Sequence, residues 1–417
     1  MPVFLYNIFL LLFRAGMHLV SLFNPKARKW VEGRKDLYKK LEQAIPADEK
    51  IIWVHCASLG EFEQGRPVIE RLRTQGTGHK LLLTFFSPSG YEAQKDYKGA
   101  NWVFYLPMDG PRNARRFLEI VHPSLVIFVK YEFWYYYLKK IKYRNIPLLL
   151  ISALFRKDMS FFKWYGGLQR KILSRFDHLF VQNESSKELL HQIGLSHITS
   201  VSGDTRFDRV IEIAEKFEPL PLIEQFIGNK ITVVAGSTWK EDEELLSRFK
   251  EDWPNDDKKW IIAPHEISQH HMTELKKLFP DSVLYSELTA AGPDKSVLLI
   301  DNVGMLSKLY RYATVAFIGG GFSKGGIHNV LEAAVYGKPV MFGPNYSKYY
   351  EASQLIETGA AISIDDRGEF DVNIDLIAYG IEINKEMSRK AKDYVYANKG
   401  ATDKIVRFIQ EKRLLTN

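Results

Sequence analysis

Hydrophobic and polar positions divide the chain into an apolar N-terminal segment and two successions of short apolar runs separated by stretches of helical period. After the first of these runs, for example, Val68, Ile69 and Leu72 follow helical spacing. Strands that are apolar throughout and separated by helices indicate parallel sheets covered on both faces. The strands expected in the first half are 51–56, 80–86, 101–106, 124–130, 146–152 and 178–182.

The succession starts afresh after 216–230, a segment with two prolines that is typical of a linker. A length of 417 residues also favours two domains. We therefore predict an α/β protein with two Rossmann-like, doubly wound domains facing a cleft, and ligands at the carboxyl ends of the strands. The strands expected in the second half are 231–236, 259–264, 296–300, 314–320 and 338–343. The predicted parts are an apolar and basic segment at 1–40, a first domain at 41–215, the linker at 216–230 and a second domain with a helical tail at 231–417.

Residues 3–23 form an apolar run that only Asn7, Arg14, His18 and Ser21 interrupt. A secretory signal would carry a positive charge before the run and a small-residue cleavage site after it, and neither is present. Arg14 makes spanning a bilayer costlier by roughly 2.5–3.5 kcal/mol, so a helix that lies on the membrane competes with one that crosses it. A buried core helix is the third alternative. We favour membrane attachment.

The net charge of +7 is concentrated between Lys26 and Lys40, where seven basic residues face two acidic ones. Placed after an apolar run, such a patch suits the anionic headgroups of a cytoplasmic leaflet, at about 1 kcal/mol per charge. A nucleic-acid binder would instead spread its basic residues over a groove or face. We therefore expect a protein on the cytoplasmic side of a membrane, with no nucleic-acid partner.

The segment HCASLGEFEQG (55–65) passes from the end of a strand to a helix that begins near Glu61. A carboxylate at a helix N-terminus is stabilised in its ionised form by the helix dipole, so Glu61 is able to accept a proton. Ordinary capping of the helix explains the same residue without any catalysis.

Two further segments offer charged groups in the first half. KYEFWYYY (130–137) places Glu132 at the carboxyl end of a strand, among aromatic side chains that suit either sugar stacking or core packing. GDTRFD (203–208) supplies Arg206, a permanent cation for a phosphate or carboxylate. The alternative for Arg206 is an ordinary ion pair with Asp204 or Asp208.

The most informative segment of the second half is FIGGGFSKGGIHNVLEAAVYGKPVMFGP (317–344). Its glycines allow a phosphate close to the backbone, and Gly325-Gly326 is predicted to open a helix whose first turns carry Asn329 and Glu332. Glu332 is then placed to accept ribose hydroxyls. The pattern is neither the dinucleotide GxGxxG nor a Walker loop. Two other strand ends, APHE (263–266) and DNVGML (301–306), accompany it.

Histidines in and after the segment APHE (263–266) raise the question of a metal site. In His265, Glu266, His270 and His271 the second histidine lies one residue too far on for the metalloprotease signature. The single cysteine, Cys56, excludes a multi-cysteine metal site and an internal disulfide, and fits a reducing compartment. We expect no metal and no cofactor.

Together the motifs HCASLGE, KYEFW, VSGDTRFD and the glycine-rich block, in this order, resemble those of the bacterial 3-deoxy-D-manno-octulosonic acid (Kdo) transferases. The similarity runs from the apolar N-terminus through NPKARKWVEGRK to about residue 360. It implies a GT-B fold with an acceptor-binding first domain and a nucleotide-sugar-binding second domain. It also implies inverting, metal-independent transfer from a CMP-Kdo donor to a lipid A precursor, at the inner membrane.

The resemblance also assigns roles to residues. Glu61 matches the family's catalytic base, Glu132 matches a glutamate that stabilises the transition state, and Arg206 stands where lysine is usual. The positions that match CMP-binding residues are Pro264, His265, Val303, Gly304, Met305, Asn329, Val330, Leu331 and Glu332. One departure is His265, because the family usually has arginine there and a neutral histidine holds phosphate less strongly.

Three other functions compete with Kdo transfer in lipopolysaccharide core biosynthesis. A lipid glycosyltransferase that uses a UDP-sugar would share the fold and the apolar N-terminus. A nucleotide-sugar 2-epimerase would share the fold but has no need of a membrane segment. A non-catalytic membrane protein that binds sugar nucleotides would not require Glu61.

Overall fold

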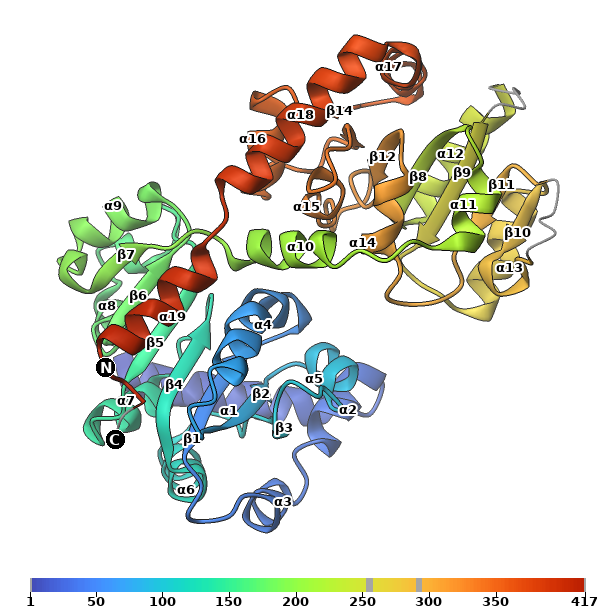
Figure 1. The fold of residues 1–417 in the computed structure, drawn as a ribbon. Coiled ribbons are helices and arrows are strands. Elements are labelled where there is room, and N and C mark those ends of the chain that lie inside the picture. The colour runs from blue at the N-terminus through green and yellow to red at the C-terminus, as the bar shows by residue number, and fades with distance from the viewer. Residues whose placement is uncertain (1, 253–257, 290–294, 416–417) are drawn as a thin grey trace. The chain divides into compact units, whose positions relative to one another are not determined.

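The computed structural model describes residues 2–252, 258–289 and 295–415, and the chain divides into two compact units. Unit 1 is formed by Met1–Arg209 together with Lys399–Asn417, and unit 2 by Val210–Asn398 (Figure 1). Both are layered α/β structures, as the sequence predicts.

In the described part of unit 1, seven parallel strands form one sheet in the order β3-β2-β1-β4-β5-β6-β7. The strands are β1 (Ile51–Cys56), β2 (Lys80–Phe85), β3 (Trp102–Tyr105), β4 (Pro123–Val129), β5 (Leu148–Ala153), β6 (His178–Val181) and β7 (Thr199–Val201). The helices are α1 (Pro2–Val20), α2 (Pro25–Glu32), α3 (Leu37–Ala44), α4 (Leu59–Thr74), α5 (Pro88–Gln94), α6 (Pro111–Val121), α7 (Tyr135–Tyr143), α8 (Gly167–Leu173), α9 (Glu184–Gln192) and α19 (Ala401–Glu411). Helix α10 (Thr205–Glu215) crosses the boundary between the units.

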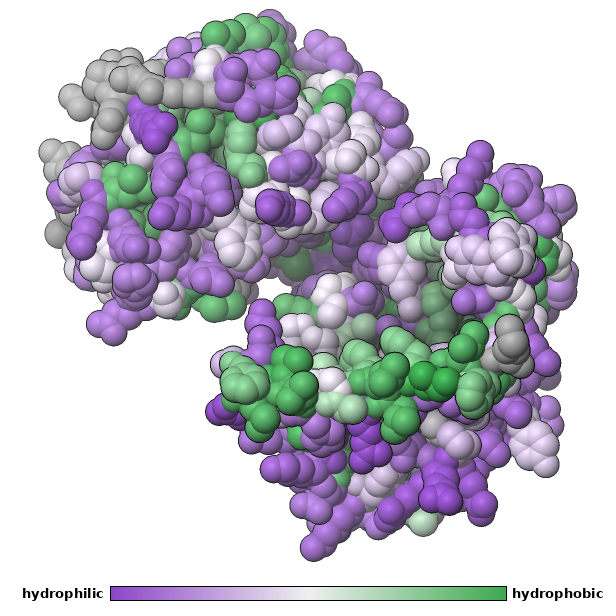
Figure 2. Space-filling view, turned by 180° about the vertical axis from the view of Figure 1, so that it is seen from behind, coloured by the Kyte–Doolittle hydropathy of each residue, from purple (hydrophilic) through white to green (hydrophobic). Residues whose placement is uncertain are grey.

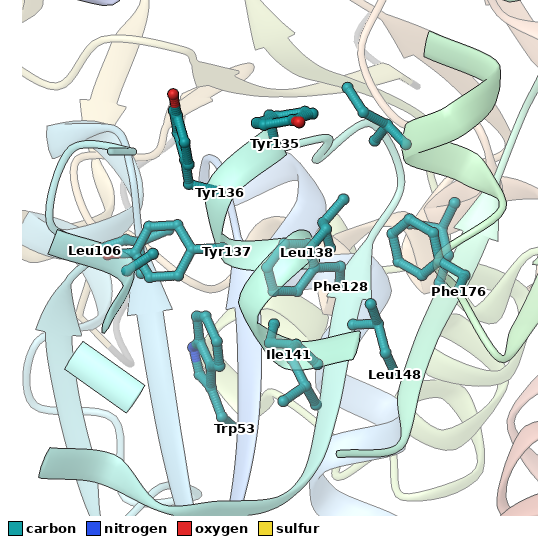
Figure 3. Packing of buried hydrophobic residues seen from close by; sticks show 14 of the residues in the cluster. Trp53, Leu106, Phe128, Tyr135, Tyr136, Tyr137, Leu138, Ile141, Leu148 and Phe176 are labelled. Atoms are coloured by element: carbon teal, nitrogen blue, oxygen red, sulfur yellow. The ribbon is translucent and has the colours of Figure 1, made fainter. Parts of the chain in front are cut away.

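The central strands of unit 1 are mainly apolar because helices cover both faces of the sheet. Along β1, Ile51 and Trp53 belong to the hydrophobic cluster on one face, and Ile52 and Val54 to the cluster on the other. Figure 3 shows the first cluster, in which residues of helix α7 pack over Trp53 and its neighbours. The ring centroids of Trp53 and Tyr137 are 5.7 Å apart.

Helix α19 corrects the predicted domain boundary, which placed the whole C-terminal tail in the second domain. The helix packs on α4, and Ile405, Val406 and Ile409 are buried in the second cluster of unit 1. The Asp208 carboxylate accepts hydrogen bonds from the backbone N–H groups of Gly400 and Thr402 at the start of the helix. The helical period of the tail reveals an apolar stripe but does not reveal which sheet that stripe covers.

In the described part of unit 2, seven parallel strands form a second sheet in the order β10-β11-β9-β8-β12-β13-β14. The strands are β8 (Ile231–Thr238), β9 (Lys258–Pro264), β10 (Ser282–Leu284), β11 (Val297–Leu299), β12 (Val315–Ile318), β13 (Val340–Phe342) and β14 (Ala361–Ser363). The helices are α11 (Pro221–Ile227), α12 (Lys240–Asp252), α13 (Gln269–Leu278), α14 (Leu306–Leu309), α15 (Leu331–Ala334), α16 (Tyr350–Glu357), α17 (Arg367–Tyr379) and α18 (Ile381–Ala397).

The predicted linker, 216–230, is a packed part of unit 2. It contains helix α11, whose Ile223 and Phe226 are buried. Pro221 occupies the start of this helix, where a missing N–H costs nothing. The prolines therefore begin a helix and do not mark a free connection.

Helix α1 packs against the rest of unit 1 through one face only. Leu10 is buried, and Tyr6, Phe13 and Met17 pack against the core, at helical spacing. The Tyr6 hydroxyl donates to Asp109 at 2.7 Å. The opposite face is a band of exposed apolar side chains (Figure 2), made by Phe4, Leu5, Ile8, Phe9, Leu11, Leu12, Leu19 and Val20. At 19 residues the helix is long and apolar enough to cross a membrane, but its packed face holds it against unit 1.

Candidate catalytic and nucleotide-binding sites

Glu61 lies in the first turn of α4, directly after β1, as the sequence predicts. Its carboxylate oxygen Oε2 accepts hydrogen bonds from the Ser58 backbone N–H at 3.0 Å and from the Ser58 hydroxyl. Glu61 therefore does cap the helix. Both bonds fall on Oε2, and within the described residues Oε1 accepts none. Capping and proton acceptance are compatible, because they use different oxygens of one carboxylate.

Glu132 is held in a buried hydrogen-bond network at the carboxyl end of β4. Its Oε2 accepts from His55 Nε2 at 2.8 Å and from the Trp134 indole N–H. On its other side His55 Nδ1 lies 2.9 Å from the Thr84 hydroxyl, which donates to it when the neutral ring carries its proton on Nε2. The network fixes the position of the Glu132 carboxylate.

His55 is a member of this network that the sequence analysis did not single out. It is fully buried in β1, between the apolar Val54 and Cys56. A polar residue within an otherwise apolar strand was the available signal, because a buried imidazole requires hydrogen-bond partners.

Glu61 and Glu132 lie at the same edge of the sheet. Burial raises the pKa of the Cys56 thiol, and the nearby charges of Glu61 and Glu132 raise it further. Glu61 is in the first turn of α4, the helix that follows β1, and Glu132 binds His55, the next-to-last residue of β1. Both carboxylates therefore lie around the end of β1, where parallel strands leave room for ligands.

Arg206 forms an ion pair with Asp204, which was the alternative to binding a phosphate or carboxylate. Its Nε and Nη2 atoms donate to Asp204 Oδ2 at 2.9 and 2.7 Å. Burial alone would raise the pKa of Asp204, but the charge and hydrogen bonds of Arg206 hold it below its usual value. Asp208 instead caps α19. Gln64, on the same helix as Glu61, donates from Nε2 to the two oxygens of Asp204 at 3.4 and 3.3 Å, so this ion pair lies beside α4.

In unit 2, His265 follows β9 and stacks between two other rings. Its ring centroid is 4.5 Å from that of Trp239 and 4.5 Å from that of His328. Burial lowers the pKa of His265, so the ring is neutral at pH 7. Trp239 Nε1 donates to His328 Nε2 at 3.1 Å, so the proton of the neutral His328 ring is on Nδ1. Pro264, also assigned to CMP, is the last residue of β9.

The glycine-rich block differs from its predicted form, because helix α15 begins at Leu331 and not at Gly325-Gly326. Gly326 has a φ of +80°, outside the helical range. Added Cβ atoms on Gly319 and Gly321 would lie 2.4 Å from backbone atoms of Ser237 in β8 and of Gly343 after β13, respectively. These two glycines therefore permit close packing within unit 2, which is a structural requirement independent of any phosphate.

Asn329 precedes α15 and so does not share a helix face with Glu332 as predicted, but the two side chains are in contact, and Asn329 Nδ2 donates to Glu332 Oε1 at 3.0 Å. The side chains of Val330 and Leu331 are fully buried. Of these two residues, only backbone atoms could therefore contact a nucleotide.

The remaining predicted positions lie in the loop before α14. Val303 is 91% exposed, Gly304 has a φ of +96°, and Met305 caps the helix. In the described ranges no three His, Cys, Asp or Glu side chains are grouped to hold a metal ion. A metal-independent reaction stays a prediction.

Comparison with known proteins first defines the class. Solved structures similar to this chain include a UDP-GlcNAc 2-epimerase from Neisseria meningitidis bound to UDP-GlcNAc (17% identity, TM-score 0.62, covering 87% of this chain and 100% of that one). A glycosyltransferase from Rickettsia africae is also similar (13% identity, TM-score 0.58, covering 89% and 100%). At these identities the likeness concerns the fold, which is of the GT-B type.

Sequence comparison then identifies the family. The model of the family "3-deoxy-D-manno-octulosonic-acid transferase (kdotransferase)" matches residues 30–209. The 3-deoxy-D-manno-octulosonic acid transferase of Aquifex aeolicus is 30% identical over 353 residues, covering 82% of this chain and 90% of that protein. The Bordetella pertussis transferase is 27% identical, with 84% and 85% covered. The chain therefore belongs to the 3-deoxy-D-manno-octulosonic acid transferase family and is a glycosyltransferase. This confirms the predicted family of lipopolysaccharide core biosynthesis.

Proposed function

We propose that this protein transfers Kdo from CMP-Kdo to a lipid A precursor, with inversion at the anomeric carbon. Membership of this family supports Kdo as the transferred sugar and CMP-Kdo as its donor. The single observation that carries the chemistry is the pair of carboxylates, Glu61 and Glu132, around the end of β1. Transfer from CMP-Kdo by the purified protein tests the proposal.

In the proposed reaction, Oε1 of Glu61 accepts the proton of an acceptor hydroxyl. The acceptor oxygen forms a bond to the anomeric carbon while the bond from that carbon to the CMP phosphate oxygen breaks. The electron pair of the broken bond leaves with CMP. Attack opposite the leaving group inverts the configuration. CMP is a good leaving group, so the protein needs only a base and stabilisation of the developing charges.

Glu132 and Arg206 supply the charge stabilisation in this scheme. Glu132, fixed by His55 and Trp134, places a carboxylate beside the developing oxocarbenium centre. Arg206, held by Asp204, offers a cation to the carboxylate of Kdo or to the leaving phosphate.

Substitution of Glu332 tests the nucleotide site. If its carboxylate accepts ribose hydroxyls, Glu332→Ala weakens CMP binding by roughly tenfold or more, since a hydrogen bond to a charged group contributes about 1.5–3 kcal/mol. Calorimetric titration with CMP measures the effect, and an unchanged melting temperature shows that folding is intact. Glu357→Ala, an exposed glutamate of unit 2, should bind CMP like the wild type. Equal affinities of all three proteins would remove the ribose assignment.

His265 predicts an unusual pH dependence of CMP binding. Burial lowers its pKa, so the ring is neutral at pH 7 and gains its positive charge only as the pH falls below the ordinary range of histidine. Since the phosphate of CMP itself gains a proton at about pH 6, the difference between two proteins isolates the effect of His265. If His265 faces the phosphate, His265→Arg should bind CMP roughly tenfold more tightly than the wild type at pH 7.5, and this gain should shrink as acidification charges His265. The control is His270→Arg, which adds the same charge at a side chain that is 85% exposed. Identical pH profiles for wild type and His265→Arg would remove His265 from the phosphate site.

We further propose that the protein lies on the cytoplasmic face of the inner membrane through α1. The helix keeps one face on unit 1 and exposes a band of apolar side chains on the other. A helix held in this way buries its free face at the level of the headgroups. This supports a helix that lies on the bilayer over one that crosses it, and keeps the protein close to a lipid acceptor.

A further inference from the structure

Unit 1 contains a cavity of about 610 Å³ between α1, the α2–α3 region, the loop 107–110 after β3 and the first turn of α6. None of the residues assigned to catalysis or to CMP lines it. Its lining has an apolar and a basic part. The apolar part includes Leu10, Leu11, Trp30, Val31, Leu37 and Met108. The basic part consists of Arg14, His18, Arg34, Lys35 and Arg112.

The basic charge of the cavity is not neutralised by its lining. The acidic residue of the lining is Asp109, which accepts hydrogen bonds from the Tyr6 hydroxyl and from the backbone N–H groups of Tyr136 and Tyr137. The carboxylate of Asp109 therefore binds α1 and α7 to each other. In the part of the chain that the structure describes, Arg14 and Arg112 form no ion pair. The cavity thus carries an excess of positive charge.

Arg34 is fixed in the wall of this cavity with donors to spare. Its guanidinium donates to the backbone carbonyls of Leu106 at 3.0 Å, Trp30 at 3.0 Å and Phe86 at 2.8 Å, and it lies 4.0 Å from the centroid of the Trp30 ring. A guanidinium has five N–H groups, so two exceed these bonds. Burial lowers the pKa of Arg34 to about 9, which leaves it charged at neutral pH. The indole N–H of Trp30 is buried and, among the described residues, has no acceptor.

The wall of the cavity is connected to a candidate catalytic residue. Arg34 binds the carbonyl of Phe86, whose ring centroid is 4.7 Å from that of Trp134. Trp134 in turn donates to Glu132. Phe86 and Trp134 thus connect the wall of the cavity to Glu132. The cavity is also bounded by α1, whose free apolar face is the proposed membrane contact.

We infer that this cavity binds a phosphorylated and acylated part of the lipid acceptor. Arg14, Arg34 and Arg112 face the phosphate, and an acyl chain lies along Leu10 and Met108. A volume of 610 Å³ is in the usual range for a single small-molecule ligand, so the cavity holds one such part and not a whole lipid with several chains. The assignment to the acceptor rests on the proposed transfer reaction.

The test measures transfer against acceptor concentration in neutral detergent micelles without phospholipid. Arg14→Gln/Arg112→Gln should raise the apparent KM for the lipid acceptor by about tenfold, with kcat at saturation and CMP affinity unchanged. The matched control is Lys39→Gln/Lys40→Gln, which removes the same charge from exposed positions of α3 outside the cavity. Equal KM values for the two double variants would overturn the inference, and so would a KM increase that appears only after phosphatidylglycerol is added.

A second arm does not depend on catalysis. Lysophosphatidic acid below its micelle concentration is titrated by calorimetry into the wild type and both double variants, beside a monoacylglycerol of the same chain. Saturable binding of the phosphate lipid alone, lost in Arg14→Gln/Arg112→Gln and kept in the control, supports the site even when no sugar is transferred. No such binding overturns it, even when Kdo transfer is normal. The failure of the site and the failure of the proposed function are thus distinguishable.

Discussion

Glu61→Gln should lower the rate of Kdo transfer by about 10²–10⁴-fold while CMP binding stays near that of the wild type. Glutamine cannot accept the proton of the acceptor hydroxyl, which is the proposed task of Oε1. Its amide oxygen can still accept the bonds that Ser58 gives to Oε2, so the helix cap is preserved. The loss should therefore appear in kcat and not in the melting temperature. Initial rates with saturating CMP-Kdo and acceptor, beside calorimetry with CMP, measure both parts.

A suitable control is Glu92→Gln, which removes an exposed carboxylate from helix α5 of the same unit. It should transfer Kdo within about threefold of the wild type, the range expected for a surface change. If Glu61→Gln retained full activity, the base would have to be another residue, and a non-catalytic role for this region would gain support.

Glu132→Gln should lower transfer by about 10²–10³-fold, the usual effect of removing one electrostatic contact to a transition state. The amide oxygen keeps an acceptor for His55 Nε2–H and Trp134, so the fold should hold. Glu132→Ala should add a loss of about 1–3 kcal/mol in the free energy of unfolding, because the buried His55 then lacks its partner. Urea denaturation of both variants gives their free energies of unfolding, and their initial rates give the loss of transfer. Together the two measurements separate the effect of the lost charge from the effect of lower stability.

Unit 2 offers a matched control in a second buried glutamate–histidine pair. Glu243 lies 3.1 Å from His271 and has no assigned role in transfer. Glu243→Gln should change stability about as much as Glu132→Gln but leave the rate near normal. Equal losses of rate in the two variants would show that Glu132 acts through folding alone.

Much of the fold follows from the hydrophobic pattern because both sheets are buried on both faces. Strands such as β1 and β4 are continuous apolar runs, which distinguishes them from the helices between them. The strands β7, β10 and β14 were not predicted, since each has three residues of which only one is buried. The equally short β11 and β13 are buried throughout and stand out as apolar runs. The position of α19 on unit 1 also depends on tertiary packing, which a local period does not encode.

Some residues of the candidate site could be predicted from the sequence and others could not, for physical reasons. Glu61 could be placed at a helix start because a small-residue turn follows a clear strand. In the glycine-rich block the predicted helix start at Gly325-Gly326 was wrong, because α15 begins only at Leu331. Gly319 and Gly321 pack against the backbone of Ser237 and Gly343, which are distant in sequence. His55 was missed because its partners come from elsewhere in the fold, Thr84 from β2 and Glu132 from the loop after β4. Contacts of this kind are visible only after the chain has folded.

The most direct test of the proposed function is Kdo transfer by the purified full chain in detergent, with a chelator present to remove divalent metals. The substrates are CMP-Kdo and a lipid A precursor, with a UDP-sugar as the competing donor. The account predicts a Kdo-bearing lipid of inverted anomeric configuration, release of CMP, and no transfer from the UDP-sugar. A folded protein that binds CMP but transfers no Kdo, or that transfers from the UDP-sugar instead, would contradict it.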